Sequence, residues 1–137
     1  MNKACPVIIR AKNNKPEVLA FIHPLAGKQL IKGTITPSET LEEACTRELE
    51  EESGLVARAI KKLGVWSTHY ENQVWGFCLM ECETEPPESW EHYTSDDGGH
   101  LFRFFWQPLD GTLPSDWHFV FKGAIQFINQ SLKTISK

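Results

Sequence analysis

The segment from Gly33 to Leu55 constrains the fold more than any other part of this chain. Its sequence, GTITPSETLEEACTRELEEESGL, holds the signals of a short helix with a defined beginning and end. Thr36 and Thr40 are each followed three residues later by a glutamate, and this capping pattern predicts a helix start at either threonine. Gly54 predicts the helix end, because glycine readily adopts the left-handed conformation found there.

Three glutamates near the end of this helix are predicted to share one face. Residues in a helix are spaced about 100° apart, so Glu48, Glu51 and Glu52 fall together and continue the apolar stripe of the first two turns. An ordinary acidic helix, the alternative interpretation, places its carboxylates opposite the apolar stripe. Like charges one turn apart repel, and the helix dipole disfavours anions at this end. A cation is therefore needed, and divalent ions such as Mg²⁺ take oxygen ligands of this kind.

Arg47 precedes the first of these glutamates and can reach two other carboxylates. Glu39 lies across the preceding loop, and Glu51 lies one helical turn further along. Arginine forms rigid, bidentate pairs with carboxylates. We therefore expect Arg47 and Glu39 to orient the site and to support the chemistry of the neighbouring glutamates.

This pattern resembles the complete Nudix box, the defining motif of the Nudix hydrolases. The residues that carry the resemblance are, in chain order, Gly33, Glu39, Arg47, Glu48, Glu51, Glu52 and Gly54. The resemblance favours Thr40 as the residue that caps the helix, with a structured loop before it. It implies Mg²⁺, or alternatively Mn²⁺, bound by the three glutamates and by the backbone carbonyl of Gly33.

The resemblance also implies which residues act in the chemistry. Glu48 and Glu52 are the expected catalytic carboxylates, with Arg47 orienting them. The general base varies within the family, and it is either a glutamate of the box or a carboxylate of a later loop. The later candidates are Glu88, Glu91, Asp96 and Asp97. Asp96 and Asp97 are favoured among them, because the flexible glycines that follow could let them approach the metal. An ordinary turn over these residues is the alternative.

Further residues are candidates for substrate binding. Lys28, Lys32 and Arg103 could contact phosphate groups, although lysines beside a loop are often solvated. Trp90 lies in a polar segment where packing explains it least, so it is a candidate for stacking on a base.

The whole chain suits one domain. Its 137 residues, with a net charge of −4, predict a single domain over residues 1–137 and no basic field for a nucleic-acid polymer. No stretch approaches a signal sequence or a membrane span, so we expect a cytoplasmic protein without a membrane partner. The four cysteines contain no CxxC pair and are expected to be buried thiols. A zinc site formed by Cys78, Cys82, His92 and His100 is the alternative, but its spacing fits no established pattern.

The order of the elements predicts the fold class. Strands are expected at 7–10, 17–23 and 100–106, a strand hairpin at 57–70 and 74–83, and a final helix at 115–135 capped by Ser115. Residues 29–32 lead into the box, and residues 85–99 are expected to form a loop because of their proline, glycine, serine and aspartate content. This order is typical of an α/β protein. The resemblance implies a Nudix-type α/β/α sandwich with a mixed sheet between helices.

The expected reaction is hydrolysis of a diphosphate linkage in a nucleoside diphosphate joined to another moiety. Two positions downstream of the box help to distinguish subfamilies, and neither carries its marker. Tyr70 stands where a proline would suggest ADP-ribose as substrate, and Gln73 stands where a tyrosine would suggest dinucleoside polyphosphates. A small nucleotide-type diphosphate is the expected partner, and capped RNA ends remain open. A catalytically silent nucleotide-binding module with the same fold is the alternative function. The oligomeric state is left open.

Overall fold

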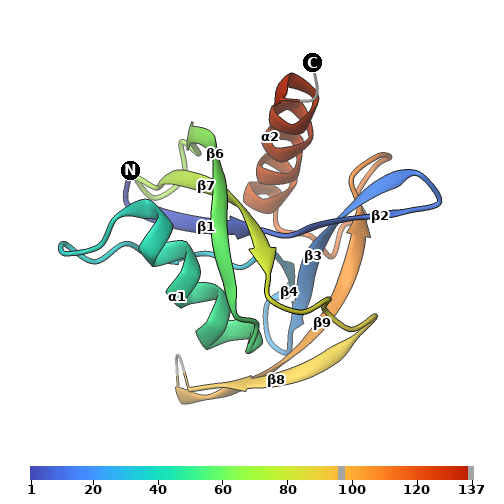
Figure 1. Ribbon diagram of the computed structural model, residues 1–137, viewed down its shortest axis with the longest axis horizontal. Coiled ribbons are helices and arrows are strands. Elements are labelled where there is room, and N and C mark those ends of the chain that lie inside the picture. Colours follow the sequence, from blue (N-terminus) through green and yellow to red (C-terminus); the bar gives the residue numbers. More distant parts are fainter. Residues whose placement is uncertain (96–97, 136–137) are drawn as a thin grey trace.

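The computed structural model describes residues 1–95 and 98–135 (Figure 1). Its strands form two sheets. The first sheet has the order β5-β1-β7-β6 and contains β5 (Gly33–Thr34), β1 (Lys3–Val7), β7 (Val74–Cys82) and β6 (Ala57–Ser67). The second has the order β2-β3-β9-β8 and contains β2 (Ile9–Lys12), β3 (Lys15–His23), β9 (His100–Pro108) and β8 (Trp90–Thr94), with β4 (Gly27–Gln29) paired to β3.

The chain passes from one sheet to the other near its beginning. β1 runs parallel to β7, whereas β2 pairs antiparallel with β3, and only Ile8 separates β1 from β2. The strand predicted at 7–10 therefore spans the boundary between the sheets. Its side chains point alternately to both sides, as they do along any strand. This crossing lets one N-terminal segment hold both sheets together.

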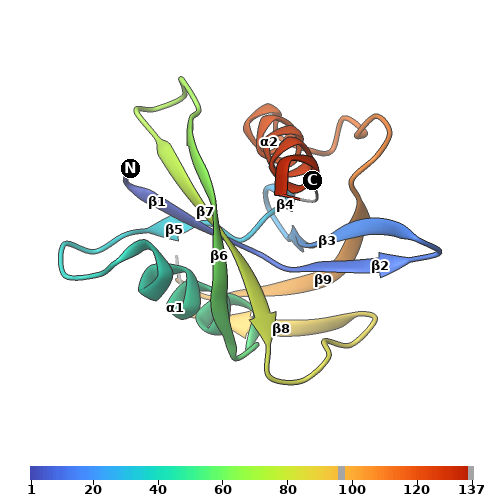
Figure 2. The ribbon, with the colours of Figure 1, turned by 45° about the horizontal axis from the view of Figure 1, so that its top comes forward.

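Two helices cover opposite sides of the strands (Figures 1 and 2). α1 (Leu41–Ser53) packs on one side and α2 (Phe119–Ile135) on the other. β3 shows why the sequence requires both: Leu19 and Phe21 belong to the cluster with α1, and Val18 and Ala20 belong to the cluster with α2. A strand buried on both faces reads as a continuous apolar run. The α/β sandwich predicted from the sequence is confirmed, and its strand layer is divided into two sheets.

The helix of the box forms as predicted. Thr40 accepts a hydrogen bond from the backbone amide of Glu43, and the side chain of Glu43 accepts one from the amide of Thr40. Gly54 adopts a left-handed conformation with φ of 79°, and its amide donates to the carbonyl of Glu50. Both ends of α1 are thus set by residues inside the segment itself.

Two predicted elements are wrong. Residues 85–99 are not one loop, because Trp90–Thr94 forms β8 and pairs with β9 from Trp90 opposite Phe104 to Thr94 opposite His100. The final helix begins at Phe119 and not at Ser115, and the imidazole of His118 accepts a hydrogen bond from the amide of Val120.

Neither helix of the described residues has both the length and the apolar character that a membrane span requires.

Candidate functional site

The glutamates of α1 are divided between burial and exposure. Glu48 and Glu52 are buried, with 7% and 9% of their surface exposed, and they continue the stripe of Leu41, Ala44, Cys45 and Leu49. Glu51 is exposed on the flank of the same face. The predicted placement of carboxylates along the apolar stripe is therefore confirmed. A solvated acidic face would not place two of three carboxylates in the interior.

Gly33 lies directly against Glu48. A Cβ atom added at Gly33 would overlap the carboxyl group of Glu48. Its φ lies outside the left-handed region, so conformational freedom does not explain the glycine. The missing side chain instead makes room for the carboxylate. This contact joins β5, at the start of the box, to the last two turns of α1.

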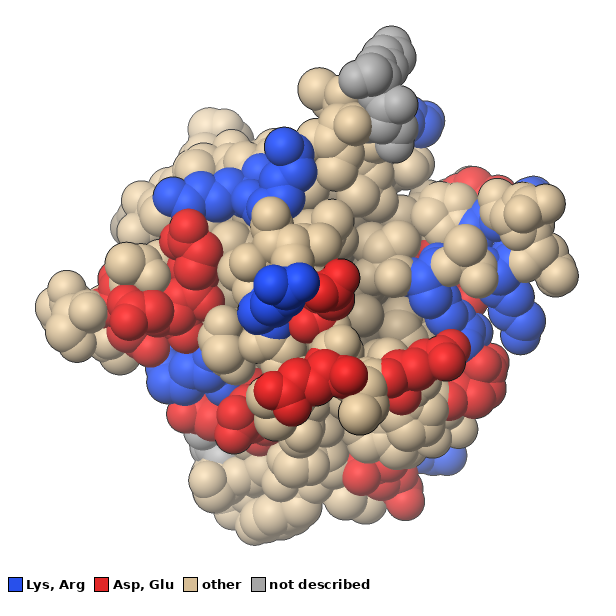
Figure 3. Space-filling view, in the orientation of Figure 1, with Lys and Arg blue, Asp and Glu red and all other residues tan. Residues whose placement is uncertain are grey.

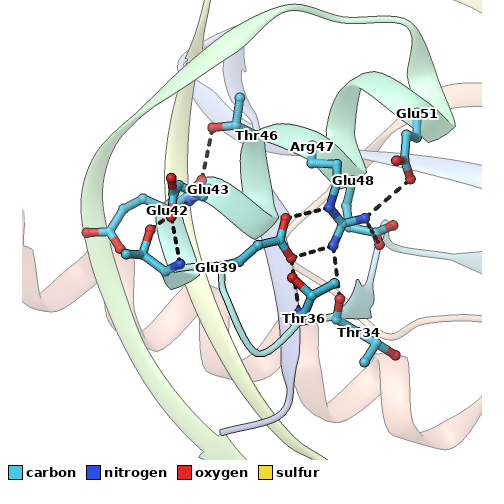
Figure 4. Close-up of polar contacts among 10 residues, drawn as sticks. Thr34, Thr36, Glu39, Glu42, Glu43, Thr46, Arg47, Glu48 and Glu51 are labelled. Carbon is cyan, nitrogen blue, oxygen red and sulfur yellow. Dashed lines mark hydrogen bonds and ion pairs between the residues drawn. The ribbon is translucent and has the colours of Figure 1, made fainter.

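The guanidinium of Arg47 organises the carboxylates around it (Figure 4). Its Nε and Nη2 donate to the two oxygens of Glu39, the second at 2.8 Å. Its Nη1 donates to Glu48 at 2.8 Å and to Glu51 at 3.3 Å, while Nη2 also donates to the backbone carbonyl of Thr34 at 3.0 Å. Arg47 thus joins the loop before α1, the helix itself and β5. The predicted pairs of Arg47 with Glu39 and Glu51 are both present.

The same network sets the ionisation of Glu39. Hydrogen bonds from Arg47, and then one from the backbone amide of Thr36, lower the pKa of Glu39 from its ordinary value of 4.5 to about 2. The carboxylates in turn raise the pKa of Arg47 further above its ordinary range. Each partner therefore keeps its charge over a wide range of pH. A permanent charge pair is suited to support and not to proton transfer.

A cavity of about 510 Å³ opens beside these residues. Three glutamates line it from α1, and two histidines line it from the second sheet. Lys32 and Gly33, at the start of the box, complete this part of the lining, which comprises Lys32, Gly33, Glu48, Glu51, Glu52, His23 and His100. Within the described part of the chain, no three His, Cys, Asp or Glu side chains are arranged to hold a metal ion. The donor set nevertheless suits a hard divalent cation, because three glutamates border one space. Arg47 currently holds two of those carboxylates.

Lys32 was predicted to bind substrate, and the structure places it at this cavity. Its ammonium group lies 5.4 Å from the ring centroid of Trp75 and 6.0 Å from that of Phe121. Burial among these rings lowers the pKa of Lys32, and the nearby carboxylate of Glu52 opposes that change. A partly desolvated ammonium group is held ready for an anion, because an anion would restore the interactions lost with water.

The two other basic residues predicted to bind substrate lie elsewhere. Lys28 pairs with Asp116 at 3.0 Å and faces the ring of Phe105, on the α2 side of the second sheet. Arg103 lies between two residues of β9 that face α1, so it points to the opposite face, where it pairs with Glu91 at 3.7 Å. The structure does not bring these cations to the cavity that Glu48 and Glu52 line.

Trp90 is accounted for by packing. Its ring stacks on Phe104, with centroids 4.8 Å apart and an angle of 11° between the planes, and its Nε1 donates to the carbonyl of Ser53 at 3.0 Å. The prediction of a free stacking surface in a loop is therefore wrong. Among the later candidates for the general base, Glu88 pairs with Arg10 and Glu91 with Arg103, and neither borders the cavity. Asp96 and Asp97 lie outside the described residues.

Two histidines lie at the cavity, a position that the sequence did not predict for either of them. His23 ends β3 and His100 begins β9, and their ring centroids are 4.7 Å apart. His23 Nδ1 accepts a hydrogen bond from the amide of Leu25 at 3.0 Å. Single histidines at strand ends carry no local signal of their own. Only the pairing of β3 with β9 brings these two rings to one wall.

The cysteines occupy the interior as free thiols. Cys5, Cys45 and Cys78 are buried and Cys82 is half-buried. Burial raises the pKa of Cys5 above its ordinary range. The zinc alternative lacks support, because Cys78 lies in the core, His92 bonds the end of α1, and His100 lies at the cavity.

Comparison with known families identifies the chain. The model of the NUDIX domain matches residues 3–124, which is nearly the whole sequence. The chain belongs to the NUDIX domain family. The box of this NUDIX domain is the segment that forms β5, α1 and the loop between them. Among curated proteins, none matches the chain significantly.

Solved structures share the NUDIX fold at low sequence identity. An ADP-ribose pyrophosphatase from Streptococcus suis is 15% identical, with a TM-score of 0.68, and the match covers 98% of this chain and 91% of the other. The NUDIX domain of Shewanella oneidensis NrtR, in complex with ADP ribose, is 16% identical, with a TM-score of 0.61 and coverage of 95% and 86%. A MutT NUDIX hydrolase from Burkholderia pseudomallei is 22% identical, with a TM-score of 0.64 and coverage of 92% and 95%.

Proposed function

We propose that this NUDIX protein hydrolyses a diphosphate linkage in a nucleoside diphosphate joined to another moiety, using Mg²⁺ or Mn²⁺. The observation that carries the proposal is the cavity in which three carboxylates of α1 face a partly buried ammonium group. Glu48, Glu51 and Glu52 supply oxygen ligands for a divalent cation, and Lys32 supplies a positive charge for phosphate. Neither feature alone would favour a diphosphate, but together they match its clustered negative charge.

The chemistry follows from the charges that must be neutralised. A bound divalent cation neutralises phosphate oxygens and lowers the pKa of a bound water molecule. Glu48 and Glu52 would hold the cation, with Glu51 and the carbonyl of Gly33 as further ligands. Arg47 keeps Glu48 and Glu51 oriented toward the cavity through the hydrogen bonds that it donates to them. Lys32 would neutralise the phosphate on the neighbouring wall.

A carboxylate of this chain would accept the proton from attacking water. Glu52 and Glu48 are the candidates within the cavity, because both are buried there beside the proposed metal position. Asp96 and Asp97 remain proposals as alternative bases. A general base must come within hydrogen-bonding distance of the water it activates, and the pH dependence of kcat reports its pKa in the enzyme–substrate complex.

A small nucleotide derivative is the proposed substrate class. The solved structures with the same fold include an ADP-ribose pyrophosphatase and a NUDIX domain in complex with ADP ribose. Basic and acidic side chains are intermixed on the face shown in Figure 3, and the net charge of −4 favours a small ligand over a nucleic-acid polymer. A capped RNA end would also present such a diphosphate. A cytoplasmic location without a membrane partner completes the proposal.

A silent nucleotide-binding module is the second candidate, and one observation favours it. Arg47 pairs with Glu48 and Glu51, so two proposed metal ligands already have a cationic partner. Such a module would bind a nucleotide without hydrolysing it.

A substrate panel with Mg²⁺ or Mn²⁺ separates the two candidates. ADP-ribose, nucleoside diphosphate sugars, dinucleoside polyphosphates and capped RNA would each be incubated with the protein, and the products identified by chromatography. The proposed hydrolase releases phosphate-bearing products in the presence of metal and none with a chelator. Binding of a nucleotide without any product, with either metal, would favour the silent module.

A further inference from the structure

The last turn of α1 needs hydrogen-bond donors from outside the helix. The final four carbonyl groups of a helix lack partners within it. The last residues of α1, Glu50–Ser53, are three glutamates and a serine, so no basic side chain of this turn compensates the helix dipole. Gly54 satisfies the carbonyl of Glu50. The remaining carbonyl groups of this turn belong to Glu51, Glu52 and Ser53, and two of these residues are proposed metal ligands.

β8 supplies two such donors from one of its faces. His92 Nε2 lies 3.1 Å from the carbonyl oxygen of Glu51, so this nitrogen must carry the hydrogen of the bond. Trp90 Nε1 donates to the carbonyl of Ser53 at 3.0 Å. Trp90 and His92 are two residues apart, and alternate residues of a strand point to the same side. β8 and the end of α1 lie next to each other in Figure 1.

Two further contacts show that the fit is close. A Cβ atom added at Gly54 would lie 3.1 Å from His92 Nδ1, so the glycine leaves room for the imidazole as well as ending the helix. The stacking of Trp90 on Phe104 fixes the indole against β9. The ring centroid of Phe104 in turn lies 5.4 Å from that of Phe21, which lines the cavity. The end of α1 is therefore held to the sheet that forms the opposite wall.

We propose that His92 and Trp90 are positioning residues, which hold the acidic end of α1 at the spacing that metal binding requires. This inference rests on the proposed function, because it concerns the same glutamates. Neither side chain borders the cavity that Glu48 and Glu52 line, and His92 lines a separate hollow with Arg47 and Glu51. We therefore assign neither residue a contact with metal or substrate. Their effect passes through the helix backbone to Glu51 and Glu52. Residues that support metal ligands in this way commonly change metal affinity when altered.

Mn²⁺ binding, measured by titration calorimetry without substrate, tests the proposal. His92→Leu removes the donor, and His92→Gln retains an amide donor of similar reach. Glu91→Leu is the matched control, since Glu91 is the neighbouring exposed residue on the other face of β8. We expect His92→Leu to weaken Mn²⁺ binding about 10-fold, with His92→Gln and Glu91→Leu within about twofold of wild type. Circular dichroism would confirm that each variant is folded at the assay temperature.

The possible outcomes distinguish positioning from simple stabilisation. Unchanged Mn²⁺ affinity in His92→Leu, even with a lower melting temperature, would overturn the positioning role and leave the proposed function intact. A wild-type protein that binds no Mn²⁺ would overturn the metal-dependent function and this inference together. Should His92→Leu fail to fold, Trp90→Phe keeps a stacking ring and loses only the donor. The same loss of affinity is expected there, and wild-type affinity would contradict the proposal.

Discussion

At the scale of single residues, local spacing predicted the positions that a helix controls. The 3.6-residue repeat placed Glu48 and Glu52 on the buried stripe, and they are buried. Partners across the sheets were not predictable in this way. The side of the sheet to which Lys28 and Arg103 point depends on strand register, which no local pattern in the box determines. His23 and His100 likewise meet only because β3 pairs with β9.

Gly33→Ala should reduce activity more than stability. The added methyl group would occupy the space of the Glu48 carboxyl group, which is the movable end of a side chain, so the carboxylate would be displaced from its position. We expect kcat/KM to fall by about 10- to 100-fold, as it does when the support of a metal ligand is lost. Steady-state kinetics beside thermal unfolding would check this. Wild-type kinetics would show that the close contact has no role in the site.

Arg47→Ala should lose stability as well as activity. Glu39 and Glu48 would both lose the guanidinium that pairs with them. Because Glu48 is buried, leaving its carboxylate unpaired is expected to cost about 1–3 kcal/mol in the free energy of unfolding. Arg47→Lys should recover only part of that loss, because an ammonium group lacks the planar fork that holds both oxygens of Glu39. Denaturant unfolding of the three proteins measures the difference. Full recovery by lysine would contradict the bidentate account.

Glu39 should contribute to acid sensitivity. Its pKa in the folded protein is lowered from 4.5 to about 2, so its stabilising contribution is present above about 4.5 and is lost as the pH falls toward 2. Melting temperatures of wild type and Glu39→Gln should therefore converge as the pH falls through this range. Glu88 has a similarly lowered pKa beside Arg10, and it titrates in both proteins, so it cancels in the comparison. A constant difference down to pH 2 would contradict the assigned shift.

At the scale of elements, α1 was predictable because its signals are local, whereas β8 was hidden. Trp90, His92 and Thr94 point inward while Glu91 and Tyr93 are exposed, which is the alternation of a strand. Prolines, serines, aspartates and glycines on both sides of this short run favoured a loop. The contact of β8 with the end of α1 joins residues that are far apart in the sequence, since His92 and Glu51 are separated by 41 positions. No local pattern could have predicted it.

Gly54→Ala tests the junction between α1 and β8. Alanine is strained at a φ of 79°, and its Cβ would crowd the imidazole of His92. We expect a loss of about 1–2 kcal/mol in the free energy of unfolding, measured with denaturant. An alanine variant as stable as wild type would mean that the end of α1 adapts without help from glycine.

At the scale of the whole molecule, two core clusters are separated by shared strands. Residues of β3 alternate between the cluster with α1 and the cluster with α2. Because the two clusters share this strand, we expect that disrupting the packing of one would also disturb the packing of the other. The class of the fold was predictable from the order of elements. The division into two sheets was not, because it depends on the crossing at Ile8 from β1 to β2.

Residues 1–137 should unfold as one domain. Shared strands predict a single cooperative transition, and probes in the two clusters should report the same midpoint. Thermal unfolding followed by circular dichroism and by tryptophan fluorescence would measure it, since Trp75 lies in the α2 cluster and Trp106 in the α1 cluster. Two separate transitions would contradict a single domain.

The central claim is that the carboxylates of α1 that line the cavity bind metal for hydrolysis of a diphosphate. It is tested most directly by the turnover of the best substrate in the panel, measured against Mn²⁺ concentration for wild type, Glu52→Gln and Glu50→Gln. Both substitutions remove one charge from the same helical turn, but Glu52 is buried at the cavity and Glu50 is exposed outside it. We predict that kcat falls by about 100-fold or more in Glu52→Gln and stays near wild type in Glu50→Gln. Equal kcat in wild type and a folded Glu52→Gln would contradict the claim.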